Sequence, residues 1–178
     1  MNYSIFHKHS LVLVSFILMG LTQCYSQDND ESLLILNKMV GTWTNSFISV
    51  LDSTRGHGVV SNELIINGRF LKMNGETIFH NDTTVGLTII GYNNTNKRYT
   101  FFHIESTDNN VLTCEGDYDT LNSTITFVFK ILKNGKDTKT QGKLIIGLGI
   151  KNLYSTEIYL IREDGYEIRL FDGVYRKE

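Results

Sequence analysis

A change of hydrophobic period at Gly41 is the feature that most constrains how this chain folds. Before it, apolar residues from Leu33 to Val40 recur at roughly helical spacing. After it, apolar and polar residues alternate with a period near two as far as the end of the chain, which is typical of strands. The sequence therefore predicts one short helix, with Gly41 as its C-terminal cap, followed by an all-β domain.

The alternating region divides into ten expected strands joined by short polar turns. Asn67-Gly68, Asn134-Gly135 and Asp164-Gly165 are dipeptides that supply the positive φ of tight hairpins. The expected strands span residues 42–50, 57–66, 69–80, 84–92, 98–106, 111–118, 123–132, 138–149, 153–162 and 166–176. Parallel neighbours need long crossovers, so these strands should form an antiparallel meander. Because closure removes exposed edges, an up-and-down β-barrel is favoured over a sandwich.

The first 26 residues are expected to be a leader rather than part of the fold. The 11-residue apolar run from Leu11 to Leu21 is shorter than the roughly 20 residues that span a bilayer, and it fits the core of a signal peptide. Cleavage after Ser26 would leave a single domain, 27–178, exported to the periplasm or out of the cell. A lipoprotein tethered at Cys24 and an uncleaved anchor remain open as alternatives.

Charge and cysteine content narrow the possible partners. The chain has 17 basic and 19 acidic residues, so no basic face for nucleic acid is expected. No second long apolar run would hold the domain in a membrane once the leader is removed. Cys114 would then be the one remaining cysteine, which excludes an internal disulfide and is typical of an apolar strand residue. The oligomeric state stays open.

The triplet Gly41-Thr42-Trp43, between the expected helix and the first strand, resembles the G-x-W signature of the calycins, the lipocalin-like barrels. That resemblance implies that Trp43 closes one end of the barrel and that an arginine of the last strand lies across its ring. Arg176 has the matching position, with Arg169 as the alternative. The roles implied for Gly41, Trp43 and Arg176 are structural rather than catalytic.

An ordered set of motifs also resembles the DUF1579 domain family. The matching segments are Leu36 to Trp43, Asn67 to Leu71, Ile89 to Asn93, Arg98-Tyr99, Gly116 to Asp119 and Tyr175 to Lys177. Two positions depart from the family pattern: Asn93 replaces the usual aspartate, and His103-Ile104-Glu105 stands where Trp-x-Asp is usual. The family has no agreed activity, so the resemblance implies a fold over residues 33–178 and no reaction.

One expected strand carries the best candidates for a ligand site. Tyr99, Phe101, His103 and Glu105 alternate along it and so share one face. If that face points inward, a histidine and a carboxylate would form a polar spot in an aromatic cavity, the usual way to orient a small ligand. If it points outward, the intervening residues would fill the interior. Alternation leaves both orientations open, because both faces carry aromatic residues.

Other side chains offer weaker signals. Arg69, just after the Asn67-Gly68 turn, could bind an anionic ligand at the barrel mouth or pair with Glu63. No cofactor is expected, with haem held by His80 or His103 as an alternative, although His80 falls in an expected loop. The histidine spacing forms no zinc pattern, and no catalytic motif is present, so neither a metal ligand nor a catalytic residue is assigned.

These observations favour an exported barrel that binds a small, largely apolar ligand, because ten strands enclose more space than eight. One alternative is a barrel filled by its own side chains that acts as a structural or protein-interaction module; it predicts an apolar patch on one outer face. The other alternative is an enzyme that uses His103 and Glu105 as an acid–base pair.

Overall fold

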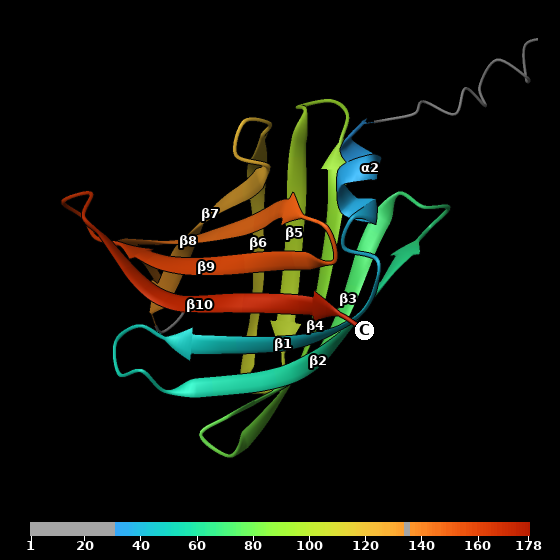
Figure 1. Ribbon diagram of the computed structural model, residues 1–178. Helices are drawn as coiled ribbons and strands as arrows, with labels where there is room; N and C mark the ends of the chain where they lie inside the picture. The colour runs from blue at the N-terminus through green and yellow to red at the C-terminus, as the bar shows by residue number, and fades with distance from the viewer. Residues whose placement is uncertain (1–30, 134–135) are drawn as a thin grey trace, which may run out of the picture. The chain divides into compact units, whose positions relative to one another are not determined.

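Ten antiparallel strands close into one barrel, in which every strand pairs with its neighbours in sequence and the last strand pairs with the first (Figure 1). The computed structural model describes residues 31–133 and 136–178, so the expected leader and the Asn134-Gly135 turn lie outside the described residues. The all-β, up-and-down, lipocalin-like barrel that the sequence predicts is confirmed.

The barrel is preceded by one short helix, α2 (Glu31–Asn37). The strands are β1 (Gly41–Ser49), β2 (Arg55–Ile65), β3 (Phe70–Phe79), β4 (Asp82–Asn93), β5 (Arg98–Glu105), β6 (Asp108–Asp119), β7 (Thr124–Lys133), β8 (Lys136–Ile150), β9 (Leu153–Ile161) and β10 (Glu167–Lys177). Every expected strand is present. The largest difference is at β6, which begins three residues early because Glu105 and Asp108 pair across a tight turn.

The helix ends earlier than the sequence predicts. The backbone N–H groups of Lys38, Met39 and Val40 each bond to the carbonyl three residues back, so the chain tightens after Asn37. Gly41 then begins β1 instead of capping the helix. Its φ of 128° is a conformation that other residues rarely adopt, and a Cβ there would lie 2.7 Å from Cε of Lys177.

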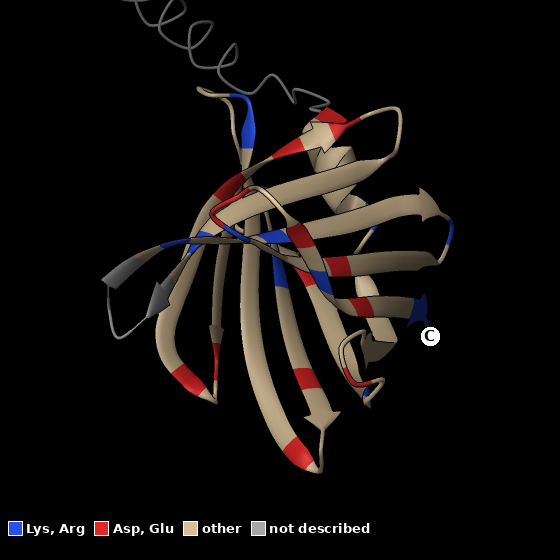
Figure 2. Cartoon of the chain, turned by 90° about the vertical axis from the view of Figure 1, so that its left-hand side faces the viewer, with Lys and Arg blue, Asp and Glu red and all other residues tan. Residues whose placement is uncertain are grey.

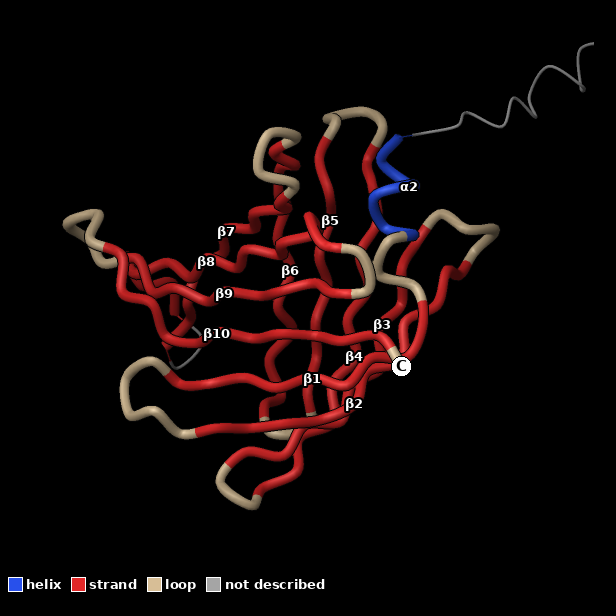
Figure 3. The backbone as a smooth tube through the Cα atoms, viewed as in Figure 1, coloured by secondary structure: helices blue, strands red, loops and turns tan. Residues whose placement is uncertain are grey.

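The two walls of the barrel cross steeply. In Figure 3 the strands β8, β9, β10, β1 and β2 run across the view, whereas β4, β5 and β6 behind them run up it and β7 slants between the two directions. Strands must tilt in this way for a sheet to close on itself. The turns between strands gather at the two ends of the barrel. Those after β2, β4, β6 and β8 lie at the end where β1 starts.

That end is closed by α2 and filled with side chains, and we call it the closed half. Leu36 and Met39 are fully buried there beside Trp43, which is 1% exposed. The Tyr99 hydroxyl donates to the Ser32 carbonyl of the helix (3.2 Å). The other buried members of this core are Ile35, Leu71, Ile90, Phe101, Ile125, Phe127, Ile146, Leu148 and Tyr154.

A lysine, not an arginine, lies against the tryptophan. Strand pairing sets Trp43 opposite Lys177, whose Nζ lies 5.5 Å from the Trp43 ring centroid and donates to the Val40 carbonyl (2.9 Å). Arg176 pairs instead with Thr44, on the outer face. The prediction that Arg176 lies across Trp43 is therefore wrong. The next residue, Lys177, does so instead, because alternation along β10 directs Arg176 outward.

Candidate functional site

The face of β5 that carries the candidate residues points into the barrel. Tyr99 is 2% exposed and Phe101 is 8% exposed, and the Phe101 ring packs 5.0 Å from the ring of Phe127. His103 and Glu105 follow at alternate positions, so their side chains share this inner face. The orientation that would place the intervening residues inside is excluded.

His103 and Glu105 form a polar cluster with Thr88 of β4. Nδ1 of His103 lies 2.8 Å from Oγ1 of Thr88, its cross-strand partner. Nε2 of His103 lies 3.6 Å from a carboxylate oxygen of Glu105, and the Thr107 hydroxyl donates to the other oxygen (2.9 Å). The His103 side chain is 30% exposed and that of Glu105 is 38% exposed, so solvent reaches this part of the interior.

Beyond the closed half, small residues line the inner face of β2, β3 and β4. Gly75 lies between inward-facing Val60 on β2 and Gly86 on β4, and a Cβ on Gly75 would meet one neighbouring atom, Cγ2 of Val60, at 3.4 Å. Gly86 in turn lies beside the His103 ring, with Cε1 at 3.2 Å from its hypothetical Cβ. We call this region, from Gly75 to the hairpin that joins β3 and β4, the open half.

Large apolar side chains line the rest of the open half. The rings of Phe47, Phe79 and Phe171 form a cluster with centroids 5.3 to 6.4 Å apart. Leu144 and Ile158, paired across β8 and β9, also face inward, and Leu144 lies at the boundary where it packs against the core of the closed half. All five side chains are only partly buried, which is the pattern of an apolar lining open to solvent.

The inner face also carries Cys114, which packs against the core of the closed half. Cys114 faces inward on β6 opposite Phe101, and its burial raises the pKa of the thiol to about 11, so the thiol stays protonated at neutral pH. Within residues 31–133 and 136–178, no group of three or more histidine, cysteine, aspartate or glutamate side chains could hold a metal ion.

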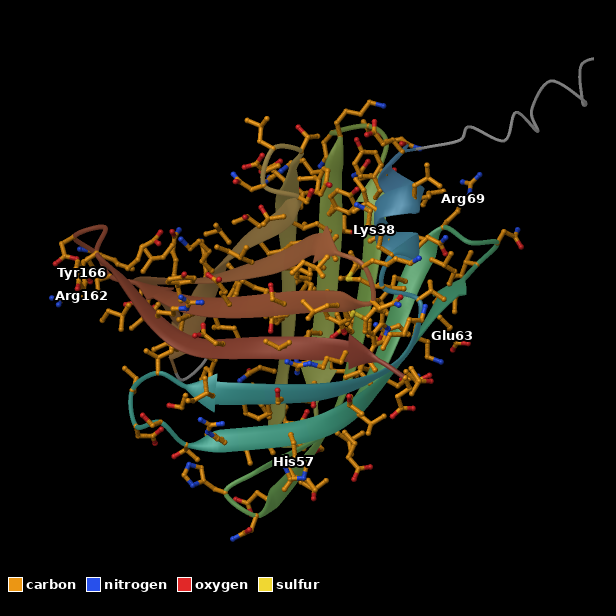
Figure 4. The ribbon with its side chains drawn as sticks, viewed as in Figure 1. Lys38, His57, Glu63, Arg69, Arg162 and Tyr166 are labelled. Atoms are coloured by element: carbon orange, nitrogen blue, oxygen red, sulfur yellow. The ribbon has the colours of Figure 1, made fainter. Side chains whose placement is uncertain are left out.

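Two other predicted residues lie outside the polar cluster. Arg69 is exposed in the turn between β2 and β3, at the closed end near α2 and Lys38 rather than at the open half (Figure 4). Its expected partner Glu63 pairs with Lys72 instead (3.0 Å). His80 lies in the turn between β3 and β4 with a positive φ of 53°, and its ring meets that of Phe79 edge to face at 4.4 Å.

Sequence reasoning missed Thr88, Gly75 and the phenylalanine cluster. Thr88 and Gly75 come from different strands, so alternation within one strand says nothing of their proximity to His103. One signal was available: glycines recur inside the expected strands at positions 75 and 86, where a residue without a side chain weakens a strand and leaves space on its face.

The outer face of the same strands carries a shallow apolar depression. It has a volume of about 410 Å³, and Phe70, Ile89 and Phe102 contribute to its lining. These side chains alternate with the inward residues of β3, β4 and β5. Phe101 and Cys114 also contribute to the lining, but they belong to or pack against the core of the closed half, so the depression is separate from the open half. No helix in the described ranges is both long and apolar enough to cross a membrane.

The fold and the lining together define a lipocalin-like barrel that is closed at one end and open at the other. A family model, "Protein of unknown function (DUF1579)", matches residues 31–177, and the chain belongs to this family.

Similar solved structures share the barrel at low identity. The S-type phycobiliprotein lyase CPES from Guillardia theta is 11% identical, with a TM-score of 0.52 over 80% of this chain and 90% of that one. A de novo designed fluorescence-activating β-barrel is 12% identical, with a TM-score of 0.47 over 80% of this chain and 96% of that one. This likeness shows the fold alone. No curated protein matches the chain.

Proposed function

We propose that this protein binds a small, largely apolar molecule in the open half of its barrel. The observation that carries the proposal is the space in front of Gly75. An inward-facing residue of a filled barrel would be tightly surrounded, yet a Cβ on Gly75 would meet one atom at ordinary contact distance. The partly exposed aromatic and aliphatic side chains around it supply apolar area that a ligand would remove from water.

The polar cluster would fix the orientation of the bound molecule. Ligand sites are commonly apolar with a few placed polar groups, and His103 and Glu105 are such groups here. Thr88 holds the histidine ring through Nδ1, which leaves Nε2 directed toward Glu105 and the interior. One end of a ligand would thus meet hydrogen-bonding groups, and its body would meet the phenylalanine cluster.

The test is binding of a neutral apolar dye, N-phenyl-1-naphthylamine, followed by its fluorescence. Wild type should enhance the fluorescence saturably. Gly75→Val should abolish the enhancement without loss of stability, because valine suits a strand and occupies the open space. Asn74→Val, which adds the same side chain to the exposed outer face, is the matched control and should bind as wild type does.

A filled interior would give the opposite result. If the dye does not bind to wild type and Gly75→Val is destabilised by overpacking, the proposed binding function is wrong.

Export is a second part of the proposal. It rests on the apolar run Leu11 to Leu21 and the small residues before Gln27. Mass spectrometry of the mature N-terminus in a cell that makes this protein tests it. A chain that starts at Gln27 supports export by a cleaved signal peptide, a lipid on Cys24 supports the tethered form, and an intact cytoplasmic Met1 excludes both.

The outer depression supports a second candidate function, protein interaction. It is the apolar outer patch that this alternative predicts, and Phe102 of β5 is one of its lining residues. Self-association is the form that can be tested directly, by sedimentation velocity over a range of concentrations. Wild type should associate and Phe102→Ser should not; a wild type that stays monomeric removes self-association through this face.

A further inference from the structure

The charged groups of the open half are distributed unevenly between its two surfaces. Glu105 faces inward, and Asp82 lies at the rim, paired with inward-facing Phe79. Strand register places the basic side chains that surround this half on the outer face: Arg55 pairs with outward Ile48, and Lys143 with outward Tyr159. Among the described side chains, none of the lysines and arginines of these strands lies on the inner face of the open half.

The hairpins at the lower end of Figure 2, which join β3 to β4 and β5 to β6, also carry acidic positions near their tips. Within the described part of the chain, the His103 ring is the one inward group that could offset Glu105, and it does so only when it is protonated. Counting only the side chains that the structure describes, the interior of the open half is therefore acidic or neutral, and an anionic ligand head would meet a carboxylate that no described inward cation balances.

We infer that the ligand is an amine: a small organic cation with an apolar body, whose ammonium group pairs with Glu105. The inference rests on the proposed binding function and specifies its ligand class. A protonated amine carries donors and no acceptor, which matches the inward carboxylate of Glu105.

The experiment is displacement of bound N-phenyl-1-naphthylamine by three eight-carbon probes: octylamine, octanol and octanoate. They share one apolar body and differ in the charge of the head group. The full exported chain is used at pH 8, at which octylamine carries a positive charge and octanoate a negative charge. Octylamine should displace the dye at a concentration about fivefold or more below that of octanol, and octanoate should be weaker than octanol.

Two variants assign this preference to Glu105. Glu105→Gln keeps the size of the side chain. It should bring the ratio between the concentrations of octylamine and octanol that displace the dye close to one. Glu76→Gln, on the exposed outer face of β3, removes the same charge and should keep the wild-type ratio. Circular dichroism of both variants confirms that they fold.

The outcomes separate this inference from the binding function it rests on. If the dye binds but octanol or octanoate displaces it as well as octylamine does, the amine assignment is wrong and the binding function stands. If Glu105→Gln keeps the wild-type preference for octylamine over octanol, the Glu105 carboxylate does not determine that preference. If the dye does not bind at all, both are overturned.

Discussion

The carbonyl oxygen of Met39 shows how single residues hold the closed end. It accepts hydrogen bonds from Nε1 of Trp43 and Nδ2 of Asn62, both 2.8 Å long and buried. The tight turns after Asn37 place this carbonyl beside the tryptophan, which the G-x-W resemblance alone does not explain. Asn62 is the residue that sequence reasoning missed here, because an asparagine in a strand carries no signal of burial.

Asn62→Ala should destabilise the protein by about 1–3 kcal/mol, because it removes one donor from a buried carbonyl and leaves a small cavity. Urea unfolding measures the difference. Asn74→Ala, on the exposed face of β3, is the control and should change the free energy of unfolding by less than about 0.5 kcal/mol. Equal effects of the two substitutions would contradict the role given to Asn62.

At the scale of the element, the register of β10 determines which of its side chains pack inside the barrel. Tyr175 faces inward and stacks on Tyr154 with 4.2 Å between ring centroids. Burial raises the pKa of both phenols. The residues on either side of Tyr175 point outward, and at the end of the strand Lys177 folds back over Trp43. An arginine and a lysine next to each other in sequence therefore have different roles.

Lys177→Met should lower stability by about 0.5–1.5 kcal/mol, because it keeps the apolar stem but loses the cation over Trp43 and the bond to Val40. Arg176→Met is the matched control on the outer face and should be close to neutral. Thermal or urea unfolding compares them. A larger loss of stability in Arg176→Met than in Lys177→Met would contradict the role given to Lys177.

At the scale of the whole molecule, the barrel is asymmetric along its axis. The fully buried side chains gather in the closed half with α2, whereas most inward residues of the open half are partly exposed or are glycines, with Ser49 at 5% exposure as an exception. Ile90 and Thr84, both inward on β4, lie in the two different halves of one continuous strand. Local stability should follow packing density rather than strand membership.

Hydrogen exchange followed by NMR tests this gradient. Amides of β4 and β5 in the closed half, such as those of Ile90 and Phe101, should exchange roughly tenfold or more slowly than those near Thr84 and Glu105. Bound N-phenyl-1-naphthylamine should slow exchange mainly in the open half. Uniform protection along both strands would mean that the barrel is packed evenly from end to end.

Much of this architecture follows from the sequence. Alternation after Gly41 and the short Asx-Gly turns are local properties, and they define ten strands whose neighbours in sequence must pair antiparallel. The shared face of Tyr99, Phe101, His103 and Glu105 is equally local, because side chains two apart in a strand point the same way.

Only the tertiary structure decided which face of β5 is inside, that Thr88 holds His103, and that Lys177 rather than Arg176 covers Trp43. Each depends on contacts between strands distant in sequence, and on the register set when β10 closes against β1. A pattern of period two describes both faces of a strand alike. When both carry aromatic residues, the packing of the whole barrel determines which of them is buried.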